Sequence, residues 1–434
     1  MSSLLFAACS DDTLPQEEEK TEPPIEIPST SEKPDEDKPD NGGSEPPVDI
    51  APLHIEGRYL KNEAGKTVNL HGFTQTYSPY FNNNAWGDYD VQACLSYNKR
   101  MVDEILAVGW KFNFVRMHLD PYWSDDASLL NVRYEGHERF SETRFRKYLK
   151  ELFIPMTEYF ISKGMYVVMR PPGVCPNNEP ADRYQGIELG DTYQTFLLKV
   201  WDIVSQDAAV RNNPGIMFEL ANEPVHIKGT DGRYGGNGDA CFINMQKYFQ
   251  SIVDKIRNNC DNIIWVPGLG YQSQYAGYAT HRITGKNIGF AVHCYPGWYG
   301  SDAEQDSSEG IGSSTGGGYA SFKRGWDAQV GPVAAFAPIM VTEIDWAPKK
   351  YDATWGKSTT GTAGGSGFGA NFKKIADDSG NVSWLFFTTK SHELAAFKDV
   401  PGTSGNYTFL NDPEACPWPI YHWFKEYAEA DAVR

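Results

Sequence analysis

The sequence predicts an α/β protein: a (β/α)8 barrel preceded by a β-hairpin and a disordered N-terminal spacer. Eight short apolar runs lie between residues 51 and 434, and most of them are separated by a helical stretch. Consecutive parallel strands need a crossover, usually a helix, so this alternation indicates a parallel sheet. A doubly wound sheet is the competing arrangement, but no Gly-x-Gly-x-x-Gly motif follows the first strand, so we expect the barrel.

The strands of the barrel are expected where short apolar runs are bounded by turn residues. A hairpin precedes the barrel over residues 53–74, with a Gly-containing turn at 62–65. The eight strands are expected at 68–70, 112–117, 165–169, 216–220, 263–266, 288–292, 339–341 and 382–387.

The helices are expected where apolar residues recur at helical spacing. These stretches lie at 96–108, 142–163, 192–204, 242–256, 368–376 and 421–430. The helix of the fifth unit, at 271–276, is the shortest of the set. The Gly- and Ser-rich stretch at 296–318 is expected to form a loop at the rim of the barrel.

The N-terminus predicts export. Residues 1–9, MSSLLFAAC, place small residues before Cys9, which is similar to the lipobox of a bacterial lipoprotein. We interpret this segment as a signal remnant with a lipid anchor through Cys9. We therefore expect a secreted protein or an outer-membrane surface lipoprotein of a Gram-negative bacterium, and a monomer.

Residues 10–50 predict an acidic, Pro-rich disordered linker. Positions 11–50 hold fourteen Asp or Glu, three Lys and eight Pro. Such a segment cannot bury enough apolar surface to offset the entropy of ordering. The single folded domain is therefore expected at residues 51–434.

The charge of the chain excludes several classes of partner. The formal net charge is −18, which repels nucleic acid and anionic membrane surfaces and favours a neutral or cationic ligand.

The sequence has no apolar run that is long enough to cross a membrane. The cysteines form no Cys-x-x-Cys pair and no zinc-like spacing with histidine, so we expect no metal site and no cofactor.

Chemically active residues follow the predicted strands at their carboxyl ends, where the active site of such a barrel lies. They comprise two carboxylates, two imidazoles, a guanidinium, an amide, a phenol and an indole. In chain order they are Arg116, His118, Asn222, Glu223, His293, Tyr295, Glu343 and Trp384.

This inventory suits glycoside hydrolysis. One carboxylic acid protonates the leaving oxygen and a carboxylate attacks the anomeric carbon from the other face, with the two groups about 5–5.5 Å apart in a retaining enzyme. Arg116 and Tyr295 are expected beside Glu343, where they favour its ionised form. Asn222 is placed to bind a sugar hydroxyl, and the face of Trp384 is expected to stack on a pyranose ring.

The segment Asn222-Glu223-Pro224 after the fourth strand, His293-x-Tyr295 two strands later and Glu343 one strand further resemble glycoside hydrolase family 5. The resemblance covers roughly residues 52–430. It implies a retaining (β/α)8 enzyme in which Glu223 is the acid/base and Glu343 the nucleophile. Arg116, Asn222, His293, Tyr295 and Trp384 match the accessory positions of the family.

The chain departs from the family pattern in one place. Many members carry a histidine after the third strand, where this chain reads Met169-Arg170-Pro171-Pro172. His118 and Arg170 are the two candidates to replace it. Glu219 is also close to Glu223 in the sequence, and we expect it to point into the barrel or to pair structurally, since a buried acid needs a partner.

The predicted function is a retaining endo-β-1,4-glycanase of plant cell-wall polysaccharide, with β-glucan or cellulose as the leading substrate. Tryptophans in the rim loops suggest an open cleft for a polymer; they are Trp86, Trp123, Trp298, Trp346 and Trp355. An endo-β-1,4-mannanase is the alternative enzyme. A non-catalytic surface glycan-binding protein is the alternative from another class, but such a protein has no need of two opposed carboxylates.

Overall fold

The computed structural model describes residues 50–75, 91–119, 140–171, 186–301, 318–346, 366–387 and 416–433. The predicted signal remnant and almost all of the predicted linker lie outside these residues. No helix in the described part of the chain is both long enough and apolar enough to cross a membrane.

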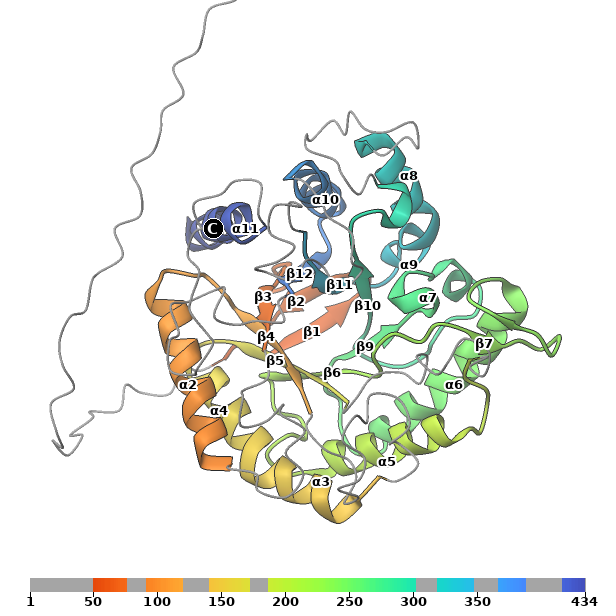
Figure 1. The fold of residues 1–434 in the computed structure, drawn as a ribbon, viewed down its shortest axis with the longest axis horizontal. Coiled ribbons are helices and arrows are strands. Elements are labelled where there is room, and N and C mark those ends of the chain that lie inside the picture. Colours follow the sequence, from red (N-terminus) through yellow and green to blue (C-terminus); the bar gives the residue numbers. More distant parts are fainter. Residues whose placement is uncertain are drawn as a thin grey trace, which may run out of the picture. The chain divides into compact units, whose positions relative to one another are not determined.

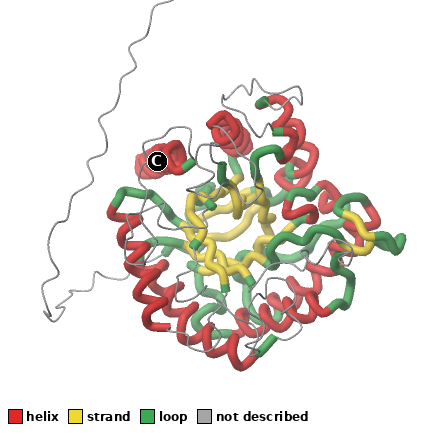
Figure 2. The backbone as a smooth tube through the Cα atoms, in the orientation of Figure 1, coloured by secondary structure: helices red, strands yellow, loops and turns green. Residues whose placement is uncertain are grey.

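Eight parallel strands form a closed barrel, which confirms the predicted fold class. Each strand pairs with its neighbours in the order β10-β11-β12-β3-β4-β5-β6-β9, so the strands follow one another around the barrel in chain order. They are β3 (His71–Thr74), β4 (Phe114–His118), β5 (Tyr166–Arg170), β6 (Ile216–Glu219), β9 (Ile264–Pro267), β10 (Ile288–Cys294), β11 (Ile339–Ile344) and β12 (Val382–Phe386). Figures 1 and 2 show these strands at the centre of a ring of helices.

The helices of the ring follow the strands in sequence. They are α2 (Val91–Ala107), α3 (Glu142–Tyr148), α4 (Ile154–Ser162), α5 (Thr192–Gln206), α6 (Asp239–Arg257), α7 (Leu269–Gln272), α8 (Tyr319–Gln329), α9 (Gly331–Ala334), α10 (Ser366–Ser379) and α11 (Pro417–Val433). Short turns of 3-10 helix, η3 (Ala276–Ala279) and η4 (Trp298–Gly300), follow β9 and β10. Polar caps begin two of the helices: Ser141 accepts from the Arg144 backbone N–H, and Asp191 accepts from that of Gln194.

The helix predicted over 142–163 is interrupted in the structure. A π-helical segment, η2 (Leu149–Phe153), separates α3 from α4. Pro155 stands at the start of α4 and has no backbone N–H to bond the carbonyl four residues earlier. The π-helical turn lies directly ahead of this proline, and prolines and π-bulges both mark places where a helix departs from regular α geometry.

The N-terminal hairpin is present, but its turn differs from the prediction. β1 (Leu53–Glu56) pairs with β2 (Tyr59–Asn62) through a tight turn at Gly57-Arg58. Gly57 has φ 57°, a left-handed conformation that glycine adopts without steric cost. The turn predicted at 62–65 closes only an isolated bridge between Lys61 and Thr67. A second two-stranded sheet joins β7 (Ile227–Lys228) to β8 (Tyr234–Gly235).

Alternation along the strands sorts side chains into two cores. The interior of the barrel contains Phe114, Val168, Met340 and Leu385, and the layer between barrel and helices contains their chain neighbours, such as Val115. Successive side chains of a strand point to opposite faces, so the residue two positions along β4 from Phe114 also faces the interior. This alternation brings Arg116 into the barrel and orients the strand ends that carry the polar residues.

Candidate active site

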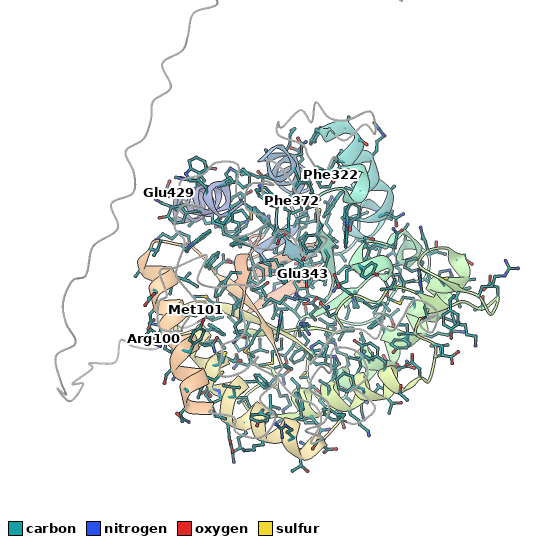
Figure 3. All side chains as sticks on the ribbon, in the orientation of Figure 1. Arg100, Met101, Phe322, Glu343, Phe372 and Glu429 are labelled. Atoms are coloured by element: carbon teal, nitrogen blue, oxygen red, sulfur yellow. The ribbon has the colours of Figure 1, made fainter. Side chains whose placement is uncertain are left out.

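Two carboxylates lie together at the centre of the barrel mouth. Glu223 follows β6, and Glu343 belongs to β11. One oxygen of each carboxylate and a ring nitrogen of His293 all lie within 4.8 Å of one another. The side chain of Glu223 is 24% exposed and that of Glu343 7%. Figure 3 shows Glu343 over the strands, at the middle of the ring of helices.

Glu343 accepts two hydrogen bonds from buried donors. Arg116 Nη1 donates to Oε1 at 2.7 Å, and the Tyr295 hydroxyl donates to Oε2 at 2.5 Å. Burial, and after it the charge of Glu343, holds the pKa of Tyr295 well above its ordinary value, so the phenol keeps its proton and donates. A carboxylate that accepts charge-assisted hydrogen bonds in this way is oriented for nucleophilic attack.

Glu223 has the opposite environment. Burial raises its pKa to about 7, against the positive charges of Arg116 and Arg170, which lower it. His293 Nδ1 lies 2.8 Å from Glu223 Oε1, and burial lowers the pKa of this histidine to about 4, so the ring is neutral. A carboxyl group with a raised pKa next to a carboxylate that accepts from a guanidinium and a phenol is the arrangement expected of an acid and a nucleophile.

The backbone of Glu223 is itself unusual. Its φ is 45°, in the left-handed region that few residues other than glycine adopt. Such conformations gather at active sites, where the surrounding structure maintains them. Asn222, the preceding residue, is buried and accepts from Arg116 Nη2 at 2.8 Å through its side-chain oxygen. This contact leaves the Asn222 amide nitrogen as a donor for a ligand.

Three residues that were not predicted as site residues complete the buried network. Glu219 Oε2 accepts from Arg116 Nε at 2.6 Å, and Glu219 Oε1 from Arg116 Nη2 at 2.9 Å. Gln272 and Thr342 also donate to Glu219 Oε1, at 3.0 and 3.1 Å. The expectation that Glu219 pairs inside the barrel is therefore confirmed. The alternation in Phe218-Glu219-Leu220 is the signal that points it inwards, but nothing in the sequence identifies Gln272.

His118 and Arg170 lie side by side on the neighbouring strands β4 and β5. Arg170 Nη2 is 3.2 Å from His118 Nδ1, and both side chains are buried. Burial, followed by the charges of Arg170 and Arg116, holds the pKa of His118 well below its ordinary value, so this ring accepts as a neutral imidazole. The two residues predicted as alternatives for the missing family histidine thus form one pair.

Trp384 does not lie at the mouth of the barrel, where it was predicted to stack on a sugar. The structure buries it between the barrel and the helices, edge-on to Phe372 of α10 and Phe424 of α11, with 1% of its surface exposed. Leu385 and Phe387 are the residues of this segment that face the barrel interior, since alternation sends Trp384 and Phe386 outwards. Trp384 therefore has no ring face available to a sugar.

A hollow of about 550 Å³ is lined by residues that follow β9 and β10 and by residues of α8. Tyr271, 41% exposed, and Trp298 form part of its lining, and their ring centres are 6.5 Å apart. The Tyr271 backbone N–H donates to the carbonyl of Pro224 at 3.1 Å, which ties this wall to the residue after Glu223. Of the other rim tryptophans, Trp346 is fully buried, and Trp86, Trp123 and Trp355 lie outside the described residues.

Glu223, His293 and Glu343 are also the one set of side chains in the described ranges with the spacing of metal ligands. The two-carboxylate reaction needs no metal ion, since a proton donor and a nucleophile suffice. The arrangement supplies a carboxylic acid, an oriented carboxylate and neutral hydrogen-bond donors around one small space, which suits displacement at an anomeric carbon.

Comparisons with known proteins agree with this chemistry. A family model described as cellulase, glycosyl hydrolase family 5, matches residues 62–324. No curated protein matches the chain. A β-glucanase from Saccharophagus degradans, solved in complex with cellotetraose, is similar with a TM-score of 0.56 and 15% identity, over 87% of this chain and 94% of that chain. The native form of the same enzyme gives a TM-score of 0.55, with the same identity and coverage.

A second enzyme also has a similar solved structure. The catalytic domain of an endoglucanase from Thermobifida fusca, in complex with cellotetraose, is similar with a TM-score of 0.50 and 15% identity, over 86% of this chain and 97% of that chain. At these identities the structural likeness shows the barrel fold alone.

Proposed function

We propose that this chain, which belongs to glycosyl hydrolase family 5, is a retaining endo-β-1,4-glucanase acting on cellulose-type β-glucan of plant cell walls. Membership of the family makes it a glycoside hydrolase. The observation that carries the finer proposal is the close approach of Glu223 and Glu343, whose nearest oxygens lie within 4.8 Å, in opposite environments. Retaining enzymes hold their carboxyl groups about 5–5.5 Å apart, whereas inverting enzymes leave roughly 6.5–9.5 Å for a water.

The proposed reaction has two steps. In the first, Glu343 attacks the anomeric carbon while Glu223 gives its proton to the glycosidic oxygen, so the leaving sugar departs and a glycosyl ester forms on Glu343. In the second, ionised Glu223 takes a proton from water, the water oxygen attacks the same carbon, and Glu343 leaves. Arg116 and Tyr295 receive the carboxylate of Glu343 when the ester breaks.

The aromatic hollow supports an endo-acting enzyme. Tyr271, one of its lining residues, belongs to the turn that bonds Pro224 and Val225, directly after Glu223, and the proposed role of Glu223 as acid is on the leaving-group side of the cleaved bond. Tyr271 and Trp298 offer ring faces of the kind on which pyranoses stack, and no charged side chain of the described residues lines the hollow. Binding of several sugar units on this side of the cleaved bond is what we expect of an enzyme that cuts within a polymer. Glucan is preferred as the substrate because the similar solved structures include β-glucanases, two of them solved with cellotetraose.

A reducing-sugar assay on carboxymethylcellulose, mannan and xyloglucan tests the proposed function. We expect turnover on carboxymethylcellulose, with oligosaccharides of several lengths as the early products. Turnover on mannan alone would replace the glucanase by a mannanase. Binding of these glycans without release of reducing ends would identify a non-catalytic glycan-binding protein.

The pH profile of kcat/KM is expected to fall on the alkaline side as pH rises through about 7. Glu223 must be protonated to act as the acid, and burial raises its pKa to about 7. Above that value each further pH unit removes about nine-tenths of the active form. The measurement is kcat/KM on a soluble β-glucan between about pH 4 and 9. A decline that begins near 4.5, the ordinary value for glutamate, would contradict the assignment.

We also propose that Cys9 carries a lipid anchor, that residues 10–50 are a spacer, and that the protein acts outside the cell. Deleting residues 10–48 is expected to leave both the melting temperature and the turnover of soluble substrate unchanged. The segment is too acidic and too rich in Pro to contribute a core. Thermal unfolding and a soluble-substrate assay of the deletion variant measure this. Loss of folding on deletion would mean that the segment packs against the barrel.

A further inference from the structure

A buried ion pair between Arg116 and Glu219 adjoins Glu223 and Glu343, the two carboxylates proposed to be catalytic. Arg116 and Glu219 are both fully buried, and two of the guanidinium nitrogens donate to the Glu219 carboxylate, at 2.6 and 2.9 Å. The same guanidinium donates to Glu343 at 2.7 Å and to Asn222 at 2.8 Å. Arg116 is therefore shared between the attacking carboxylate and a carboxylate that neither attacks the sugar nor transfers a proton.

Glu219 accepts hydrogen bonds from more side chains than its ion-pair partner Arg116 alone. Besides Arg116, Gln272 Nε2 and Thr342 Oγ1 donate to its Oε1, so three side chains direct donors at one carboxylate. Buried ion pairs are weak sources of stability, because desolvation of both charges offsets much of their attraction. Such a pair is more readily understood through what its charge and geometry do to the neighbouring Glu343.

Gln272 reaches Glu219 from a strained turn. Gly270, Tyr271 and Gln272 have consecutive left-handed φ values of 58°, 59° and 60°. Gln272 is fully buried, and its Oε1 has no hydrogen-bond partner among the described residues. Strained backbone and an unpaired buried acceptor both oppose folding, and backbone strain of this kind gathers at functional sites. This turn brings the Gln272 amide into contact with Glu219.

The turn also adjoins the acid/base. Tyr271 and Gly270 donate their backbone N–H groups to the carbonyls of Pro224 and Val225, at 3.1 and 3.0 Å. The charge of Glu223 acts on the Tyr271 phenol and contributes to its raised pKa, after burial. One short turn thus lines the aromatic hollow with Tyr271 and fixes Glu219 with Gln272.

The charged and titratable groups that face Glu223 come from every element around it. They are Arg116 of β4, Arg170 of β5, Glu219 of β6, Tyr271 of α7, His293 of β10, Tyr295 after β10 and Glu343 of β11. Burial raises the pKa of Glu223 most; among the charges, Arg116 and Arg170 lower it and Glu219 raises it. The negative charge of Glu219 therefore opposes the effect of Arg116 on the acid while leaving Arg116 bonded to the nucleophile.

We propose that Glu219 is a positioning residue for the reaction, and that Gln272 fixes it there. The pair holds the guanidinium of Arg116 between Glu343 and Asn222 and offsets its positive charge at Glu223. Arg116 can then orient Glu343 without favouring the ionised form of Glu223, which must stay protonated to act as the acid. This inference rests on the proposed function, because it assigns Glu223 as acid and Glu343 as nucleophile.

Glu219→Gln tests the proposal, since it keeps the size of the side chain and removes its charge. The alkaline limb of the kcat/KM profile is expected to move to lower pH by about one unit, because the charge of Arg116 is no longer offset. KM measured below the limb is expected to stay unchanged. Glu219→Asp, which keeps the charge, is expected to leave the limb at its wild-type position even where kcat falls.

The matched control is Glu142→Gln, a change of the same kind at an exposed residue of α3 that pairs with Arg146 at 2.8 Å. It is expected to leave the pH profile and the melting temperature unchanged. A folded Glu219→Gln variant with an unmoved alkaline limb would overturn the proposal. So would an equal shift in Glu219→Asp, because the charge would then not be the cause.

Gln272→Met carries the test if Glu219→Gln does not fold. This change removes one donor to Glu219 and leaves every charge of the site in place. A lower kcat with an unchanged KM and an unmoved alkaline limb is expected, and an unchanged kcat would overturn the positioning role. Wild-type protein without turnover on any β-glucan or mannan would overturn the proposed function first, whereas active wild type with unresponsive variants overturns this inference alone.

Discussion

Replacing Glu343 by glutamine is expected to abolish turnover on polymer and on activated aryl glycosides alike, by at least about 10⁴-fold. The change removes the nucleophile, so neither a better leaving group nor an added anion restores the retaining route. The fold is expected to survive, because the introduced amide can accept from Arg116 and donate to the Tyr295 hydroxyl, the two groups that bond the native carboxylate.

Steady-state rates and thermal unfolding of Glu343→Gln check this expectation. The melting temperature shows whether lost activity reflects chemistry or misfolding. Turnover within about tenfold of wild type would place the nucleophile elsewhere, since loss of a covalent nucleophile costs far more than this. The family assignment of the two roles would then have to be abandoned.

Replacing Glu223 by glutamine is expected to lower turnover on polymer by about 10²–10⁴-fold, the usual contribution of a general acid. An activated aryl glycoside, whose leaving group needs no proton, is still expected to glycosylate Glu343. Hydrolysis of that ester then lags, because Glu223 is also the base for water. Azide, which needs no base, is expected to speed the second step and to yield a β-glycosyl azide.

The two variants together separate the roles of the carboxylates. Each is assayed on polymer and on an aryl glycoside, with and without azide, beside wild type as the control. Formation of a β-glycosyl azide by Glu343→Gln in place of Glu223→Gln would reverse the assignment. Full activity of both variants on polymer would show that the reaction takes place at another site.

The barrel was predictable because its strands are short apolar runs between helices. Seven of the eight predicted strands overlap observed strands; the first, expected at 68–70, lies instead at His71–Thr74. His71 and Gly72 do not read as an apolar strand, although both are buried in the structure. Helix α8 was missed because Gly325 interrupts its helical pattern. A Cβ at Gly325 would collide with the carbonyl of Tyr299, so close packing requires the glycine.

The two carboxylates proposed to be catalytic, and most of their partners, could be predicted from the ends of the strands. The contacts of Arg116 and Tyr295 with Glu343 were expected, because residues at the ends of parallel strands converge. The side to which Trp384 points was not predictable, since the residues at 384–387 are all apolar and hide the alternation. Gln272 could not be found either, because left-handed backbone at a residue other than glycine has no signature in the sequence.

The anomeric configuration of the first product tests the central claim most directly. Proton NMR of an oligosaccharide hydrolysis, followed from its first minutes, distinguishes the two anomers before they interconvert. With carboxylate oxygens within 4.8 Å of each other there is no space for water between Glu343 and the sugar, so the β-anomer is expected to form first. Initial formation of the α-anomer would show inversion and contradict the two-step mechanism through Glu343.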